Sequence, residues 1–211
     1  VAGVTYVVKR GGYWTTLMLK EMGLCEAYSR YIYLALQICG IDCHIVLGKA
    51  GCPHAWNLVK LNGHWFHMDA TWDDPISSRP MLRHDYFCIS DKAIARDHRW
   101  NTETYPAAPE MSNSYFKKQH RYFTRYEELW AAVGEAYRGG AADFEAKLTP
   151  LAKETAKDGG SFPAALAEFT KKNPEIRVES YTRSATDPAI IYLTFTPKES
   201  TRKDVTPTER K

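Results

Sequence analysis

Residues 54–74 read HAWNLVKLNGHWFHMDATWDD, and this stretch decides the fold of the chain. At its centre stands Asn62-Gly63, a pair that tolerates the positive φ angles of a two-residue turn and therefore predicts a β-hairpin. In that hairpin Leu61 lies opposite His64, and successive side chains alternate between the two faces of each strand. One face then carries His54, Trp56, Leu58, Trp65, His67 and Asp69.

The same register brings a histidine within reach of an aspartate. It places His54 opposite Thr71 and diagonal to Asp69. Diagonal neighbours on a sheet are close enough for long side chains to meet, so we expect His54 and Asp69 to form a hydrogen bond. Such a pair supplies a base and the group that orients it.

A nucleophile is available upstream, at Cys25. The segment from Cys25 reads CEAYSRYIYLALQIC, with apolar residues on all sides and Gly40 after it, which predicts a buried helix of about four turns. A thiol in the first turn of a helix is stabilised as the thiolate, which lowers its pKa from about 8.5. The free amides there can also bind an oxyanion. Cysteine, histidine and aspartate are the set used for acyl transfer through a thiol.

Three segments resemble the transglutaminase-like superfamily of cysteine enzymes, in its microbial branch. They read GLCEAYS from Gly23, HAWNLV from His54 and HMDATWDDP from His67, and YFCISD from Tyr86 is similar to the segment that usually follows. The resemblance covers about residues 15–100. It implies an α+β, papain-like fold in which the helix that carries the cysteine packs on an antiparallel sheet.

The resemblance also implies the roles of the site residues: Cys25 as the nucleophile, His54 as the general base and acid, and Asp69 as the orienting carboxylate. It implies no cofactor. The calcium dependence of the animal enzymes is not expected here, because no acidic loop of the chain has calcium-ligand spacing.

Other residues compete for these roles. His67 lies on the same predicted face as His54, and the hairpin alone leaves it open as the base; the match of His54-Ala-Trp to the family favours His54. Asp73 and Asp74 lie beyond the predicted strand, where we expect turn or cap residues.

An oxyanion-hole side chain is harder to assign. In the superfamily it is usually a Gln or an aromatic residue upstream of the cysteine, and the candidates here are Tyr13 and Trp14. Trp56, Trp65 and Trp72 are expected in the core or in the wall of a cleft that accepts an extended peptide.

The cysteines and histidines also raise the question of a metal site. Their spacings, Cys-x3-Cys, Cys-x-His and His-x2-His, do not form a recognised pair of zinc knuckles, so we expect no metal. The five cysteines are an odd set, which leaves at least one free thiol, and a disulfide from Cys39 or Cys43 to Cys52 stays open for an exported protein. The side chains considered are Cys39, Cys43, His44, Cys52, His54, His64 and His67.

Composition limits the classes of partner. The 211 residues are 44% hydrophobic and 13% aromatic with a net charge of +3, which indicates a globular protein and gives no reason to expect nucleic acid or an anionic membrane as partner. No apolar run approaches 18 residues, so no membrane span is expected. The sequence starts with Val, which suggests a processed protein or an excised fragment, and we favour a secreted or cell-envelope location.

The chain divides near residue 120. Residues 1–120 are predicted to form the catalytic domain and residues 121–196 a small α+β module, with helices over 126–137 and 162–172 and a hairpin of strands over 176–181 and 189–195. Residues 141–157 fit a strand around 144–148 or a helix. The charged tail, 197–211, is expected to be disordered.

Two functions follow. The first is a cysteine enzyme that attacks a peptide bond or a glutamine side-chain amide in a protein or peptide substrate through a thioester, with the peptidase slightly favoured over the cross-linking enzyme. The second is a catalytically silent binding or scaffold protein that keeps the fold. The reactivity of Cys25 discriminates between them.

Overall fold

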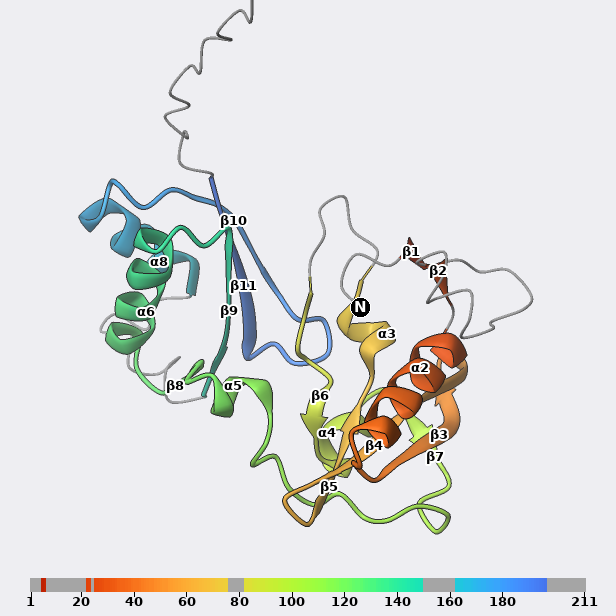
Figure 1. The fold of residues 1–211 in the computed structure, drawn as a ribbon. Helices are drawn as coiled ribbons and strands as arrows, with labels where there is room; N and C mark the ends of the chain where they lie inside the picture. Colours follow the sequence, from red (N-terminus) through yellow and green to blue (C-terminus); the bar gives the residue numbers. More distant parts are fainter. Residues whose placement is uncertain (1–4, 7–21, 24, 76–81, 150–161, 197–211) are drawn as a thin grey trace, which may run out of the picture.

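The computed structural model describes residues 5–6, 22–23, 25–75, 82–149 and 162–196, and two sheets dominate it (Figure 1). The first sheet has five strands in the order β6-β5-β4-β3-β7, and each pair of neighbours is antiparallel. Its strands are β3 (Cys43–Ala50), β4 (Cys52–Leu61), β5 (His64–Met68), β6 (Phe87–Ile89) and β7 (Arg99–Trp100). The α+β class and the antiparallel sheet are confirmed.

The predicted hairpin is β4–β5, and its register is confirmed. Leu61 pairs with His64, and the ladder continues without a shift. Asn62 and Gly63 form the turn with φ angles of 53° and 83°, the left-handed region that this dipeptide tolerates.

One part of the hairpin prediction is wrong. Strand β5 ends at Met68, so His54 has no strand partner at Thr71, which lies in the short helix α3 (Ala70–Asp73). The reason is helix capping: the side chain of Asp69 accepts hydrogen bonds from the backbone N–H groups of Thr71 and Trp72, which starts a helix where the pattern predicts more strand.

Helix α2 (Cys25–Ile38) packs on β3 and β4 (Figure 1) and is followed by Gly40 at φ 70°, as expected of a helix stop. The expectation that it is buried is wrong. Its buried residues are Ala27, Tyr28 and Ser29, and Ile38 is 79% exposed. A helix on the outside of a sheet buries one side, and the apolar residues on its other side face outward.

The opposite face of the first sheet carries an aromatic core. Trp56 is 1% exposed there and lies across from Val46 on β3. The turn and loops around α4 (Asp91–Ile94) close this face. The buried members of the cluster are Val46, Trp56, Leu58, Tyr86, Ile89, Ile94 and Ala108.

The second sheet has four strands in the order β10-β11-β9-β8. Helices α6 (Tyr126–Arg138) and α8 (Phe162–Lys172) cover one face of it (Figure 1), and α5 (Tyr115–Lys118) lies near the other through Phe116. Both long helices and the β10–β11 hairpin are confirmed, and β9 shows that the strand alternative was the right one. The strands are β8 (Tyr122–Phe123), β9 (Asp143–Leu148), β10 (Val178–Arg183) and β11 (Ile190–Phe195).

Near the N-terminus, β1 (Thr5–Tyr6) and β2 (Met22–Gly23) form a parallel pair. Tyr13, Trp14 and the tail 197–211 lie outside the described residues, as does most of residues 1–14. The domain division at residue 120 stays a prediction. In the described part of the chain, no helix is long and apolar enough to cross a membrane.

Polar contacts join the two sheets. The backbone N–H and the Nδ1 atom of His84 lie 2.9 and 2.7 Å from the two carboxylate oxygens of Glu145 on β9. The hydroxyl of Tyr192 on β11 donates to Asp85, and Arg96 forms an ion pair with Asp187 at 3.0 Å. The second sheet therefore rests on the segments that flank β6 and α4.

Gly48 allows β3, β4 and β7 to pack closely, and this predicts a cost for any side chain there. A Cβ atom at Gly48 would lie 2.3 Å from the carbonyl oxygen of Arg99 and 2.7 Å from the ring of Trp56. We expect Gly48→Ala to lower the free energy of unfolding by roughly 1–3 kcal/mol, as overpacking does, measured by urea denaturation.

The matched control is Gly134→Ala in α6, where the atoms nearest to the new Cβ are the tip of the flexible Arg138 side chain, at 3.2 Å. Ala has the higher helix propensity, so this variant should be as stable as the parent or more stable. Equal stability of Gly48→Ala and the parent protein would contradict the close packing.

Candidate active site

Cys25 is the first residue of α2, and its thiol is half-buried. The side chain forms a hydrogen bond with His54, and the backbone at Ala55 and Glu26 also bonds to the sulfur. Burial raises the pKa of the thiol, but these hydrogen bonds outweigh burial, so that the pKa of Cys25 is lowered. The site therefore favours the thiolate.

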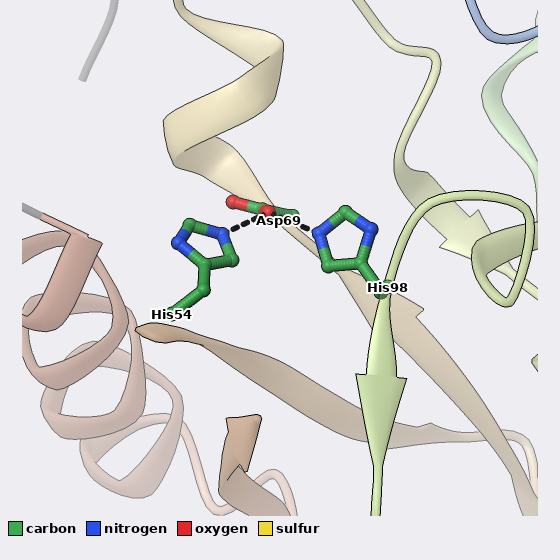
Figure 2. A group of neighbouring side chains, drawn as sticks. All are labelled: His54, Asp69 and His98. Carbon is green, nitrogen blue, oxygen red and sulfur yellow. Dashed lines mark hydrogen bonds and ion pairs between the residues drawn. The ribbon is translucent and has the colours of Figure 1, made fainter. Parts of the chain in front are cut away.

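His54 joins Cys25 to Asp69. Its Nε2 atom lies 2.6 Å from Oδ2 of Asp69 (Figure 2), which leaves Nδ1 for the thiol. Burial lowers the pKa of His54, but the hydrogen bonds to Asp69 and Cys25 outweigh it, and the pKa is raised above its ordinary value of 6.5. A lowered cysteine pKa and a raised histidine pKa together favour a thiolate–imidazolium pair.

Asp69 is held by its neighbours on both oxygens. Oδ1 accepts the backbone N–H groups of Thr71 and Trp72 at 3.0 and 3.2 Å, while Oδ2 faces His54. Burial raises the pKa of this carboxyl, but hydrogen bonds from His54 and His98 outweigh burial and lower it. Its role as a helix cap fixes the carboxylate at the end of β5.

His98 is a part of the site that the sequence analysis missed. It is fully buried just before β7, its Nε2 atom lies 3.0 Å from Oδ2 of Asp69 (Figure 2), and its Nδ1 atom lies 2.5 Å from Oδ1 of Asp97. In the sequence, Asp97 and His98 stand in the charged segment ARDHRW, which has the composition of an exposed loop. In the sequence, the adjacent Asp97 and His98 were the signal that could have pointed to this part of the site.

His67, the rival base, is not brought to the thiol. Its Nδ1 atom accepts the indole N–H of Trp56 at 2.9 Å, and its Nε2 atom lies 2.8 Å from Asp91. Burial lowers its pKa and outweighs the effect of Asp91. The imidazole is therefore neutral and donates through Nε2. It supports the site indirectly, because the ring of Trp56 stacks on His54 at a centroid distance of 5.9 Å.

The other two aspartates have structural contacts. Asp73 is buried and accepts the backbone N–H of Tyr86 at 2.9 Å, and burial, together with the negative charges of nearby carboxylates, raises the pKa of its carboxyl. Asp74 accepts the hydroxyl of Tyr28 at 2.7 Å, and it is the C-cap residue of α3. The expectation of a cap residue is met by Asp74, whereas Asp73 lies inside the helix.

The disulfide left open by the sequence is not formed. All five cysteines are free. In the β3–β4 ladder Cys43 pairs with Val59 and Cys52 with Ala50, so these two cysteines lie at opposite ends of the strand pair.

Within the described ranges, the group of histidines, cysteines and acids close enough to be considered for a metal ion is His54, Asp69 and His98. Two ligands on a tetrahedral zinc ion, each about 2.0–2.1 Å from the metal, lie roughly 3.3 Å apart. The Nε2–Oδ2 distance of 2.6 Å between His54 and Asp69 is too short for such a pair. It is the length of a strong hydrogen bond, which fits the orientation of a base.

Comparison with known families agrees with this geometry. Residues 4–70 match the family model described as the transglutaminase-like superfamily. This part of the chain is similar to that superfamily. The match covers less than half of the chain and includes Cys25, His54 and Asp69. The superfamily is in general one of cysteine-based enzymes, which supports cysteine chemistry for the transglutaminase-like core. A comparison with curated proteins gives no match.

The different surroundings of the five thiols predict selective alkylation. Burial raises the pKa of Cys43 to about 11 and that of Cys88 to about 12, whereas the pKa of Cys25 is lowered. At pH ~6.5 iodoacetamide should therefore modify Cys25 fastest, since the thiolate is the reactive form. Peptide mass spectrometry measures each rate, with the exposed Cys39 and Cys52 as references.

His54→Ala should remove the advantage of Cys25 in the same assay, because it removes the hydrogen bond that lowers the thiol pKa. Equal rates at Cys25 and Cys39 in the parent protein would contradict the thiolate–imidazolium pair.

Proposed function

We propose that the protein is a cysteine-dependent enzyme that transfers or hydrolyses the acyl group of a peptide bond or a glutamine side-chain amide. In this proposal Cys25 is the nucleophile, His54 the general base and acid, and Asp69 the orienting carboxylate. The observation that carries the proposal is that His54 interacts with the Cys25 thiol and its Nε2 atom lies 2.6 Å from the buried Asp69 carboxylate.

The first half of the reaction forms a thioester. The Cys25 thiolate attacks the carbonyl carbon, and the C=O bond becomes a C–O⁻ single bond in a tetrahedral intermediate. The Nδ1–H of the His54 imidazolium gives its proton to the departing amine, the C–N bond breaks, and neutral His54 remains. Asp69 keeps Nε2–H in place throughout, which fixes the tautomer that presents Nδ1 to the reaction.

The second half resolves the thioester. His54 Nδ1 takes a proton from water or from an acceptor amine as that nucleophile attacks the carbonyl carbon, and the C–S bond then breaks to return the thiolate and the imidazolium. Water gives a free carboxylic acid, whereas a lysine gives an isopeptide cross-link. We favour hydrolysis slightly, and the acceptor decides the outcome on one and the same site.

Charge on the carbonyl oxygen has a donor at the start of α2. The first four N–H groups of a helix have no acceptor within it, and Cys25 is the first residue of this one. Its backbone N–H is suited to bind the oxyanion next to the attacked carbon. Trp72, which is half-buried with its ring centroid 6.1 Å from that of His54, is a suitable wall for a peptide substrate.

The alternative is a silent scaffold that keeps the fold. A binding protein has no need of a thiol with a lowered pKa, of a histidine with a raised one, or of a buried carboxylate with four donors. These features favour the enzyme.

Replacing the nucleophile tests the enzyme directly. Cys25→Ala should lower the turnover of a casein digest or a glutamine-containing peptide by a factor of at least about 10³, because the step that forms the thioester is lost. The release of new α-amino groups measures hydrolysis, and uptake of a fluorescent primary amine measures cross-linking. Cys39→Ala, at an exposed thiol, is the control and should keep the parent rate.

Both variants should keep the far-UV circular dichroism and the urea midpoint of the parent protein. Turnover by Cys25→Ala at the parent rate would refute the assignment of the nucleophile.

Replacing the carboxylate tests the orientation of the base. In Asp69→Asn the amide oxygen can cap α3 as before, so the NH₂ group points at His54 and favours the wrong tautomer. Activity should fall by about 10²–10⁴, as when the carboxylate of a catalytic triad is replaced. The negative charge that raises the pKa of His54 is also lost, so the imidazolium should persist only to a lower pH.

The charge of His54 is read from Cys25 alkylation by two reagents. Anionic iodoacetate is attracted by the imidazolium, and neutral iodoacetamide is not. The rate with iodoacetate divided by the rate with iodoacetamide therefore falls with rising pH, at the pH where His54 loses its proton. This inflection should move to lower pH in Asp69→Asn. It should stay in place in the control, Asp91→Asn, which alters the same kind of pair at His67. An unmoved inflection in Asp69→Asn would show that the carboxylate does not set the pKa of His54.

A further inference from the structure

One carboxylate oxygen serves two buried imidazoles. Oδ2 of Asp69 lies 2.6 Å from Nε2 of His54 and 3.0 Å from Nε2 of His98, which enter from opposite sides (Figure 2). We propose that His98 is a positioning residue for the Cys25–His54 pair: it holds Asp69 by hydrogen bond and charge and sets how strongly Asp69 acts on His54. This inference rests on the proposed function, since it concerns the same site.

The hydrogen bond from His98 restricts rotation of the Asp69 carboxylate. Two backbone N–H groups of α3 hold Oδ1, and a carboxylate held only there can still turn about its Cβ–Cγ bond. With His54 and His98 both bonded to Oδ2, turning toward one imidazole stretches the bond to the other. The oxygen that orients His54 is thus fixed by a second, immobile partner, because His98 is fully buried.

The charge of His98 follows from its two contacts. Its Nε2 atom faces Asp69, and its Nδ1 atom faces Asp97 at 2.5 Å. Carboxylate oxygens accept hydrogen bonds, so in this proposal both ring nitrogens of His98 donate, one to Asp69 and one to Asp97. The neutral ring would place a nitrogen lone pair against one of the carboxylates.

Other groups around His98 complete its environment. The rings of Trp72, Trp56, Tyr86 and His54 surround it at centroid distances of 4.7, 5.0, 5.4 and 5.4 Å. The titratable groups that face it are Asp69, Asp97, His54 and the hydroxyl of Tyr86, and His67 lies close enough to interact with it through its charge.

The row of contacts continues to the second sheet. Asp97 accepts the hydroxyl of Tyr86 at 2.6 Å, and Thr186, in the loop between β10 and β11, lies close enough to that hydroxyl to influence its pKa. That loop is anchored next to Thr186, where Asp187 pairs with Arg96 at 3.0 Å. The second sheet therefore contributes to the position of His98, through Asp97 and Tyr86.

The proposal predicts two separate effects of removing His98. Without its hydrogen bond Asp69 holds His54 less firmly, so Cys25 should react more slowly at neutral pH. Without its positive charge the surroundings of His54 become more negative, so the imidazolium should persist to higher pH. The second effect is opposite in sign to that of Asp69→Asn, and a residue that only stabilises the fold would produce neither.

The test is alkylation of Cys25 by iodoacetamide and iodoacetate across pH, in the full chain. His98→Phe removes the hydrogen bond and the charge, and it should slow the reaction with iodoacetamide at pH 7 by about tenfold and raise the inflection of the rate ratio by about one pH unit. His98→Gln keeps a donor for Asp69 without the charge, so it should keep most of the rate while the inflection still rises. Tyr86→Phe should change the iodoacetamide rate and the inflection pH in the same directions as His98→Phe, but by smaller amounts.

Two control variants remove similar contacts from the interface between the sheets. His84→Gln alters a histidine–carboxylate contact with Glu145, and Tyr192→Phe removes a tyrosine–carboxylate bond to Asp85. Neither contact belongs to the row that ends at Asp69, so both variants should keep the parent rate and inflection. Urea denaturation of all variants reports the loss of stability separately.

The proposal is overturned if the His98 variants keep the parent rate and inflection, or if only their urea midpoints fall. Where His98→Phe fails to fold, His98→Gln decides by its inflection. If neither folds, Asp97→Asn decides, since it removes one of the two anions that keep His98 charged and should also raise the inflection. If Cys25 of the parent protein reacts no faster than Cys39, the proposed function itself fails, and that result is distinct from all of these.

Discussion

Burial of the Asp69 carboxylate sets the conditions that the rest of the site has to meet. An ionised carboxylate removed from water costs several kcal/mol unless donors replace the water. Here four donors do so: two backbone amides of α3 on Oδ1, and two imidazoles on Oδ2. None of these four donors belongs to β5, the strand that precedes Asp69. The carboxylate can therefore be both buried and charged when the hairpin, α3 and the turn before β7 are all assembled.

The first sheet meets this condition through close packing. Gly48 lets β7 approach β3, and since β7 begins directly after His98, this contact brings His98 to the end of β5. Trp56 packs against His98 and Trp100, and the hydrogen bond of its indole N–H to His67 holds it there. The same indole stacks on His54. Packing and polar contacts thus act together in positioning His54 and His98.

Local rules explain which parts of this arrangement the sequence predicted. The Asn62-Gly63 turn fixes the register of the hairpin, and with it the approach of His54 to Asp69, because a two-residue loop leaves no freedom in the pairing. The start of α3 at Asp69 was missed because the strand pattern continues through Thr71, while a single cap contact ends it. The exposure of α2 was missed because its apolar residues surround the helix, whereas only one side has a sheet to pack on. His98 was missed because it meets Asp69 across 29 positions of sequence, and no periodicity encodes such a contact.

The position of His98 also connects the second sheet to the proposed site. In the proposed arrangement the second ring nitrogen of His98 faces Asp97, and Asp97 accepts the hydroxyl of Tyr86, which lies near Thr186 of the second sheet. If the loop between β10 and β11 moved away, Asp97 would gain water and His98 would lose the partner that keeps it charged. Asp69 would then act on His54 alone. In the proposed arrangement, the basicity of His54 thus depends on a contact that the second sheet makes.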